Sequence, residues 1–228
     1  MLKGKATTGG ADFDLCPAGN HPAVCIGLID LGTHYECFQG GAEKKVRKVM
    51  LLWELEAEVE GKDKRLFVGR DFNIGLNDKG ELVYGDKSNI RKLLETWRGR
   101  AYNPDEEIDP EAVVGKACLV SIKHKPTQKG KSYAQVDSVG SLPKGMTALK
   151  PSKAKVLYSA DSDEGAPGED WLPRVFGEKV ENVLQRSLEW GGTGRKEAGG
   201  GSREPVGAGV GSGPVDPPPD EDSDNIPF

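Results

Sequence analysis

The chain has 228 residues and a formal net charge of −5. Its four scattered cysteines are too few for a disulfide scaffold, so we expect free thiols in a reducing cytoplasm. No apolar run approaches the ~20 residues of a membrane-spanning helix, and the N-terminus lacks the apolar stretch of a signal peptide. The acidity lies in residues 151–228, with 15 Asp and Glu against 8 Lys and Arg, whereas residues 1–150 have 21 against 23. The net charge therefore does not exclude nucleic-acid binding by the first 150 residues.

The first 146 residues predict a flexible N-terminal arm over 1–19 and one folded domain over 20–146. Alternating apolar residues predict strands over 21–32, 46–60, 64–73, 117–124 and 132–139, and the second and third form a hairpin. A helix over 88–98 is predicted by Ser88 as N-cap and by Ile90, Leu93, Leu94 and Trp97 at helical spacing. One helix between the third and fourth of five strands is the order of the OB-fold, a five-stranded barrel. A β-sandwich is the alternative.

The remaining residues predict little packed structure. We expect an acidic linker over 147–170 and a short amphipathic helix over 171–190. The glycine content of residues 191–215 predicts a flexible, disordered linker. Residues 216–228 form an acidic tip that we expect to bind a basic, partly apolar pocket on another protein. Its expected contact residues are Asp220, Glu221, Asp222, Asp224, Ile226, Pro227 and Phe228.

The predicted domain also carries a basic and aromatic surface on three separated segments. In an OB barrel, the face of strands two and three and two of the loops line one groove. Cations there follow phosphates, and rings stack on bases of any sequence. The ordinary alternative is that the lysines are solvated and the rings belong to the core. The expected phosphate-binding residues are Lys44, Lys45, Arg47, Lys48, Arg70, Lys123, Lys125, Lys129 and Lys131, and the expected stacking residues are Phe38, Phe67, Phe72 and Tyr133.

Metal binding and catalysis find little support in the sequence. Cys16, His21, Cys25, His34 and Cys37 are near one another but form no Cys-x₂₋₄-Cys knuckle, so we expect no metal. No nucleophile triad, phosphate-binding loop or paired acid motif is present. We therefore expect a protein that is not an enzyme and uses no cofactor.

Two parts of the sequence resemble known proteins. The ending Asp-Ser-Asp-Asn-Ile-Pro-Phe, residues 222–228, resembles the acidic tip of bacterial and phage single-stranded-DNA-binding proteins, although Asn225 stands where an acid is usual. Residues 29–33, 48–55, 89–100 and 139–146 are similar to a family of small OB-fold single-stranded-DNA-binding proteins of tailed phages.

The resemblance implies a protein that coats single-stranded DNA without sequence preference during replication, recombination or repair. It also implies that the tip recruits partner enzymes and that the protein acts in a bacterial host cytoplasm, with a homo-oligomer possible. Two alternatives remain open. One is a decoy that uses the tip to occupy host pockets without binding DNA, and the other is an RNA-binding or annealing protein.

Overall fold

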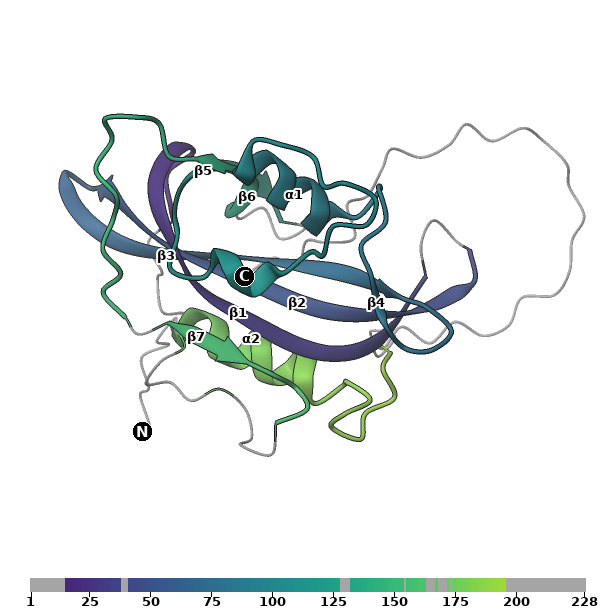
Figure 1. Cartoon of the computed structure of the whole chain (residues 1–228). Coiled ribbons are helices and arrows are strands. Elements are labelled where there is room, and N and C mark those ends of the chain that lie inside the picture. The colour runs from purple at the N-terminus through teal and green to yellow at the C-terminus, as the bar shows by residue number, and fades with distance from the viewer. Residues whose placement is uncertain are drawn as a thin grey trace, which may run out of the picture.

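The computed structural model describes residues 15–37, 41–127, 132–153, 155–162, 167, 172 and 174–195. These residues form a mainly β fold built on one sheet, with helices on both of its faces (Figure 1). The strands are β1 (Gly19–Cys37), β2 (Glu43–Val59), β3 (Lys62–Leu76), β4 (Leu82–Val83), β5 (Ala117–Pro126), β6 (Ser132–Ser141) and β7 (Val156–Tyr158).

The sheet has the order β4-β3-β2-β1-β5-β6, with β7 parallel to the middle of β1 and all other pairs antiparallel. The five predicted long strands are present, but the prediction of a five-stranded barrel is not met. Within the described residues the sheet has seven strands and is not closed into a barrel. The additional strands are short: β4 has two residues and β7 has three, too few to give a clear alternation in the sequence.

The predicted hairpin of the second and third strands is confirmed. Val59 pairs with Lys62, and the two residues between them, Glu60 and Gly61, have φ values of 54° and 73°. Positive φ at both turn residues is the geometry that matches the twist of a two-residue hairpin. This tight turn fixes the register along the whole β2–β3 pair.

Both faces of the β1–β2 pair are buried. The odd residues of β2, among them Trp53 at 0 % exposure, enter a core formed with β5, β6 and helix α1 (Asn89–Arg98). The even residues Met50 and Leu52 enter a second core, formed with β7 and helix α2 (Arg174–Leu184). The sheet is therefore the middle of three layers, and α2 lies on the side opposite α1 (Figure 1).

The predicted first helix is confirmed. It follows Ser88 and ends at Gly99, whose φ of 74° gives the left-handed cap that favours glycine. A short 3₁₀ turn, Pro110–Val113, precedes β5. The predicted helix over 171–190 is shorter than expected, because residues 185–191 form turns that bind β1 instead. In these turns the Leu188 N–H donates to the Thr33 carbonyl at 3.1 Å.

Part of the range 147–170, where an acidic linker was expected, is packed against the sheet. Residues 156–158 are β7, which pairs with Gly27–Ile29 of β1, and Val156, Tyr158 and Ala160 are buried in the second core. The acidic residues that suggested a linker begin only at Asp161. In the part of the chain that the structure describes, no helix has the length and apolar run needed to cross a bilayer.

Candidate nucleic-acid interface

Two of the four expected stacking rings lie in the core. Phe72 is 0 % exposed and Tyr133 is 8 % exposed, so neither ring presents a face to a base. For Phe72 the reason is the period of β3, in which even residues point into the first core. Phe67 points to the other face, where it is half-buried against the second core. Phe38 lies outside the described residues.

Arg70 shares the inner face of β3 with Phe72 and serves a structural role there. Its Nη1 donates to the carbonyl oxygens of Val136 and Asp137 on β6, at 3.1 and 3.0 Å. Its guanidinium also lies 5.3 Å from the centroid of the Phe72 ring. Arg70 thus links β3 to β6, two strands that do not pair in the sheet of the described residues, and its Nη1 is occupied by backbone carbonyls.

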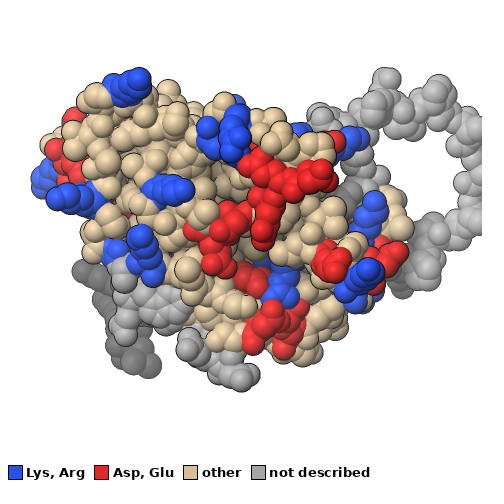
Figure 2. All heavy atoms as spheres, viewed as in Figure 1, with Lys and Arg blue, Asp and Glu red and all other residues tan. Residues whose placement is uncertain are grey.

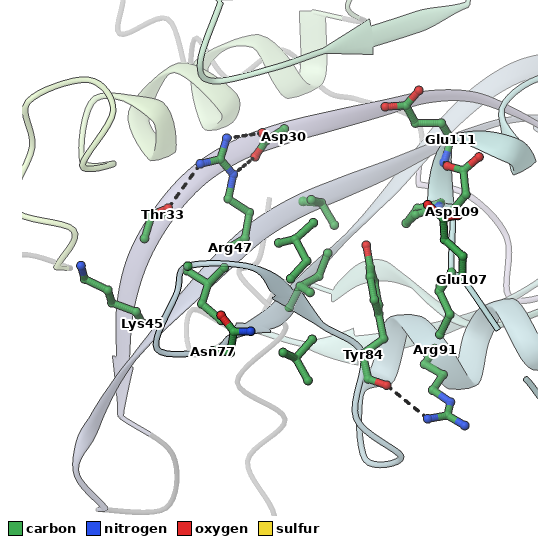
Figure 3. A pocket seen from close by; sticks show the side chains of 18 of the residues that line it. Asp30, Thr33, Lys45, Arg47, Asn77, Tyr84, Arg91, Glu107, Asp109 and Glu111 are labelled. Atoms are coloured by element: carbon green, nitrogen blue, oxygen red, sulfur yellow. Dashed lines mark hydrogen bonds and ion pairs between the residues drawn. The ribbon is translucent and has the colours of Figure 1, made fainter. Parts of the chain in front are cut away.

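Arg47 is the centre of a second structural contact, the Arg47 network, formed with three carboxylates. Its guanidinium forms ion pairs with Asp30, with Asp161 at 2.7 Å and with Glu189 at 2.5 Å. The Arg47 side chain is only 13 % exposed. Figure 3 shows the Asp30 contact at the wall of a pocket. Because three carboxylates already surround it, Arg47 contributes no free charge to a phosphate site.

Carboxylates also pair with two of the expected lysines. Lys48 lies 2.6 Å from Glu36, and both side chains are 13 % exposed. Lys123 lies 2.8 Å from Asp137, but its side chain is 62 % exposed and remains accessible. Lys125 is half-buried near the end of β5, while Lys129 and Lys131 lie outside the described residues.

The structure brings Lys45 next to an aromatic ring, Tyr35, that was not among the expected stacking residues. Lys45 pairs across the β1–β2 hairpin with Tyr35, and its Nζ lies 5.8 Å from the centroid of that ring. The guanidinium of Arg195 lies 4.5 Å from the same centroid and pairs with Glu43 at 2.8 Å. We call Tyr35, Lys45 and Arg195 the Tyr35 cluster; Lys44 precedes Lys45 on β2 and pairs across the hairpin with Glu36. The predicted strands over 21–32 and 46–60 are too short to pair Tyr35 with Lys45, and the approach of Arg195 had no signal in the sequence.

Backbone contacts hold this cluster in place. The Tyr35 N–H donates to the Gly194 carbonyl at 2.7 Å, which fastens the segment after α2 to the end of β1. Gly194 has a φ of 71°, and a Cβ there would lie 2.9 Å from Cδ2 of Tyr35. Glycine therefore allows the chain to approach the ring closely, and Arg195 follows directly.

The two predicted basic loops lie at opposite ends of β1. The hairpin that carries Lys44 and Lys45 follows Cys37, which pairs with Glu43. The hairpin that follows Lys123 and Lys125 lies beyond Gly19, which pairs with Ile122. The expectation that both loops line one groove is not met in the described residues, since the pocket that includes Lys45 includes neither Lys123 nor Lys125.

The large cleft of the described residues is acidic. It has a volume of about 1210 Å³ and lies between β1, β2, the β3–β4 turn and the loop before the 3₁₀ turn. Eight carboxylates line it, against the three cations Lys45, Arg47 and Arg91. Figure 3 shows Glu107, Asp109 and Glu111 along the wall opposite Arg47, and Figure 2 shows the acidic band on the surface. Such a cleft repels a polyanion.

One ring lines this cleft, but burial makes it a poor stacking platform. Burial is the main cause that raises the pKa of Tyr84 to about 12, and the charge of Asp109 adds to it. The phenol therefore stays neutral throughout the physiological range. Its backbone carbonyl accepts from Arg91 at 3.2 Å, which ties the backbone of Tyr84 to helix α1.

The candidate metal ligands are dispersed. His34 is buried, and its Nε2 contacts the Leu31 carbonyl at 2.9 Å, while His21 contacts the Pro17 carbonyl. Among the described residues no group of three or more His, Cys, Asp or Glu side chains is arranged to hold a metal ion. All four cysteines are free thiols, and only Cys37 is exposed.

The seven expected contact residues of the acidic tip, from Asp220 to Phe228, lie outside the described residues. The candidate interface therefore consists of the Tyr35 cluster at one end of β1 and Lys123 near the other. No protein-family model matches the chain, and no curated protein matches it either.

Proposed function

We propose that this protein binds single-stranded DNA without sequence preference, in a bacterial cytoplasm during replication, recombination or repair. The observation that carries the proposal is the Tyr35 cluster: a half-buried ring with two cations within 6 Å, at an exposed hairpin end. Single-strand interfaces combine an aromatic ring for stacking with cations for the backbone. In this role, a base stacks at Tyr35, while Lys44 and Lys45 meet the neighbouring phosphates.

The strand order supports an open form of the OB-fold as the scaffold for this activity. β1 lies between β2 and β5, β6 follows β5, and α1 is inserted before β5. The Arg70 contacts to Val136 and Asp137 bring β6 beside β3, where a closed barrel would pair them. This order fits the resemblance of residues 29–33, 48–55 and 89–100 to phage single-stranded-DNA-binding proteins.

The proposed site differs from the usual OB-fold site in its position. The outer face of β2 is covered by α2, and the large cleft is acidic, so both surfaces are closed to DNA. The ends of the strands remain accessible to DNA, and the Tyr35 cluster lies at one of these ends. We further propose that the tip, with Ile226, Pro227 and Phe228 as its apolar end, recruits partner enzymes once the protein is bound.

A gel-shift assay with labelled oligo-dT and the full chain tests the proposal. We expect the wild type to shift the oligonucleotide. We expect the double variant Lys44→Glu and Lys45→Glu to bind at least tenfold more weakly, and Tyr35→Ala to lose about 1–3 kcal/mol of binding free energy. The matched control is the double variant Lys87→Glu and Lys92→Glu, which reverses two exposed charges at and just before α1.

Two outcomes would contradict the proposal. If the wild type leaves oligo-dT unbound while a peptide of residues 216–228 binds host enzymes, the protein is a decoy instead. If an RNA oligomer competes better than DNA of the same length, the preferred ligand is RNA.

A further inference from the structure

A second positively charged surface lies far from the Tyr35 cluster. Residues 138–160 contain four lysines and no acidic residue. The lysines are Lys144, Lys150, Lys153 and Lys155, on the segment that leads from β6 to β7. We call residues 144–153 and 155 the lysine segment. Lys144, Lys150 and Lys155 are exposed, and Lys153 is half-buried.

Two hydrogen bonds hold the lysine segment against the outer face of β2 and β3. The Ser152 N–H donates to Oε2 of Glu54 at 2.7 Å. Nη1 of Arg65 donates to the Lys150 carbonyl at 3.0 Å and to Oε1 of Glu54 at 3.2 Å. Glu54 is 0 % exposed, so a buried carboxylate anchors the segment. Because both carboxylate oxygens are occupied by these donors, Glu54 presents no free oxygen to the lysines.

The four lysines form no ion pairs with the acidic side chains that the structure describes. The Lys155 side chain lies against Gly115, where a Cβ would come within 2.2 Å of its Nζ, and the exposed Lys116 is next in the chain. The segment thus has a defined path and uncompensated positive charge.

Acidic and basic side chains are unevenly distributed on the face of the molecule that Figure 2 shows. Figure 2 shows Asp and Glu gathered over the central cleft, and several Lys and Arg, with some acidic side chains beside them, at the end of the molecule where the β2–β3 hairpin and the lysine segment lie. A polyanion is repelled from the first region and attracted to the second. Arg65 pairs with Glu56 on β2, eleven residues along the strand from Lys45. At ~3.3 Å per residue, that places the two basic surfaces up to ~36 Å apart along the strand.

We propose that the lysine segment is a second phosphate-binding surface for the same DNA strand. This inference rests on the proposed function. A strand held at the Tyr35 cluster then extends along the molecule to Lys150, Lys153 and Lys155, outside the acidic cleft. The segment adds affinity and no sequence preference, because lysines contact only the phosphates.

Titration of labelled dT30 with the full chain at several salt concentrations tests this. The variant is the triple substitution Lys150→Gln, Lys153→Gln and Lys155→Gln. We expect the slope of log K against log salt to become less steep by about 2, since each phosphate contact on a single strand contributes ~0.7. The control has the same loss of charge elsewhere: Lys79→Gln, Lys87→Gln and Lys92→Gln, all exposed. We expect the control to keep the wild-type slope.

The outcomes separate the two claims. A wild type that binds dT30 with the same affinity and slope as the lysine-segment variant overturns this inference alone. An equal loss in the control variant overturns it too, because the effect is then one of net charge. A wild type that leaves dT30 unbound overturns the proposed function and this inference with it.

Discussion

The ring of Phe176 on α2 lies so close to Gly69 of β3 that a Cβ at residue 69 would stand 2.9 Å from its Cε1 atom. The same Cβ would stand 2.9 Å from Cδ2 of Leu52 on β2. Nearby, Lys179 of α2 pairs with Asp71 of β3 at 3.0 Å. α2 therefore packs on the outer face of β2 and β3. Because this face is covered, the candidate DNA site lies at the strand ends instead.

Substituting Gly69 tests how firmly α2 is packed. We expect Gly69→Ala to destabilise the protein by about 1–3 kcal/mol, since the added methyl overpacks a full core. Gly140→Ala on β6 is the control: a Cβ there meets nothing within 4 Å, and its φ is not positive. Urea unfolding measures both. Equal stabilities for the two variants would show that α2 is not seated on Gly69.

The Arg47 network supplies a second prediction, on stability. Arg47→Met leaves Asp30 and Glu189, at 20 % and 16 % exposure, without their cation. Breaking such a partly buried pair from one side should lower the free energy of unfolding by about 3 kcal/mol. Arg195→Met removes an exposed, solvent-screened pair with Glu43 and should cost much less stability than Arg47→Met. Similar losses in the two variants would contradict the structural role of Arg47.

The same network predicts a pH dependence at acid pH. Burial alone would raise the pKa of Glu189, but hydrogen bonds from Thr33 and the charge of Arg47 outweigh it and lower the pKa. The folded pKa lies below the unfolded one, so this stabilisation is present above the ordinary glutamate pKa. It is lost as pH falls through the folded pKa.

We therefore expect the stability difference between the wild type and Glu189→Gln to be largest at pH 7 and to shrink below about pH 4. Urea unfolding at pH 7, 5 and 3.5 measures this difference. A difference that grows toward acid pH would contradict the assignment of the charged form of Glu189 to the folded state.

The thiols give a prediction that depends on burial. Desolvation raises the pKa of Cys16 to about 11 and that of Cys25 to about 12, and it raises the pKa of Cys118 as well. Cys37 is exposed. Because the thiolate is the reactive form, a disulfide reagent at pH 8 should titrate one thiol in the native protein and four in denaturant. Rapid reaction of more than one native thiol would show that the core is open.

The sequence predicts the local elements of this fold better than its layers. Alternation in β2 and β3 and the helical spacing of Ile90, Leu93 and Leu94 identify elements whose pattern is set by one buried face. The amphipathic pattern of residues 171–190 predicts a helix but not which face of the sheet it covers, although Met50 and Leu52 carry that signal. Apolar residues on both faces of a strand indicate that both faces are covered. Applied to β2, this rule predicts a second layer on the side of Met50 and Leu52.

The site was harder to predict for the same reason. Whether Phe72 is a stacking ring or a core ring depends on which face of β3 it occupies, and only the register decides this. Arg47 and Arg70 look like phosphate ligands in the sequence, but they meet carboxylates and carbonyls from segments up to 142 residues away. Tyr35 and Lys45 lie outside the predicted strands over 21–32 and 46–60, so their pairing across the longer β1–β2 hairpin was not expected.

The most direct test of the central claim is one salt titration of the full-length wild type. Fluorescence anisotropy would follow its binding to labelled dT30, with a duplex of the same length as competitor. We expect binding to the single strand that weakens steeply as salt rises, by a log–log slope of ~0.7 for each phosphate contact, and little competition by the duplex. An affinity independent of salt, or no binding at the lowest salt concentration, would contradict the claim that this protein binds single-stranded DNA through its exposed cations.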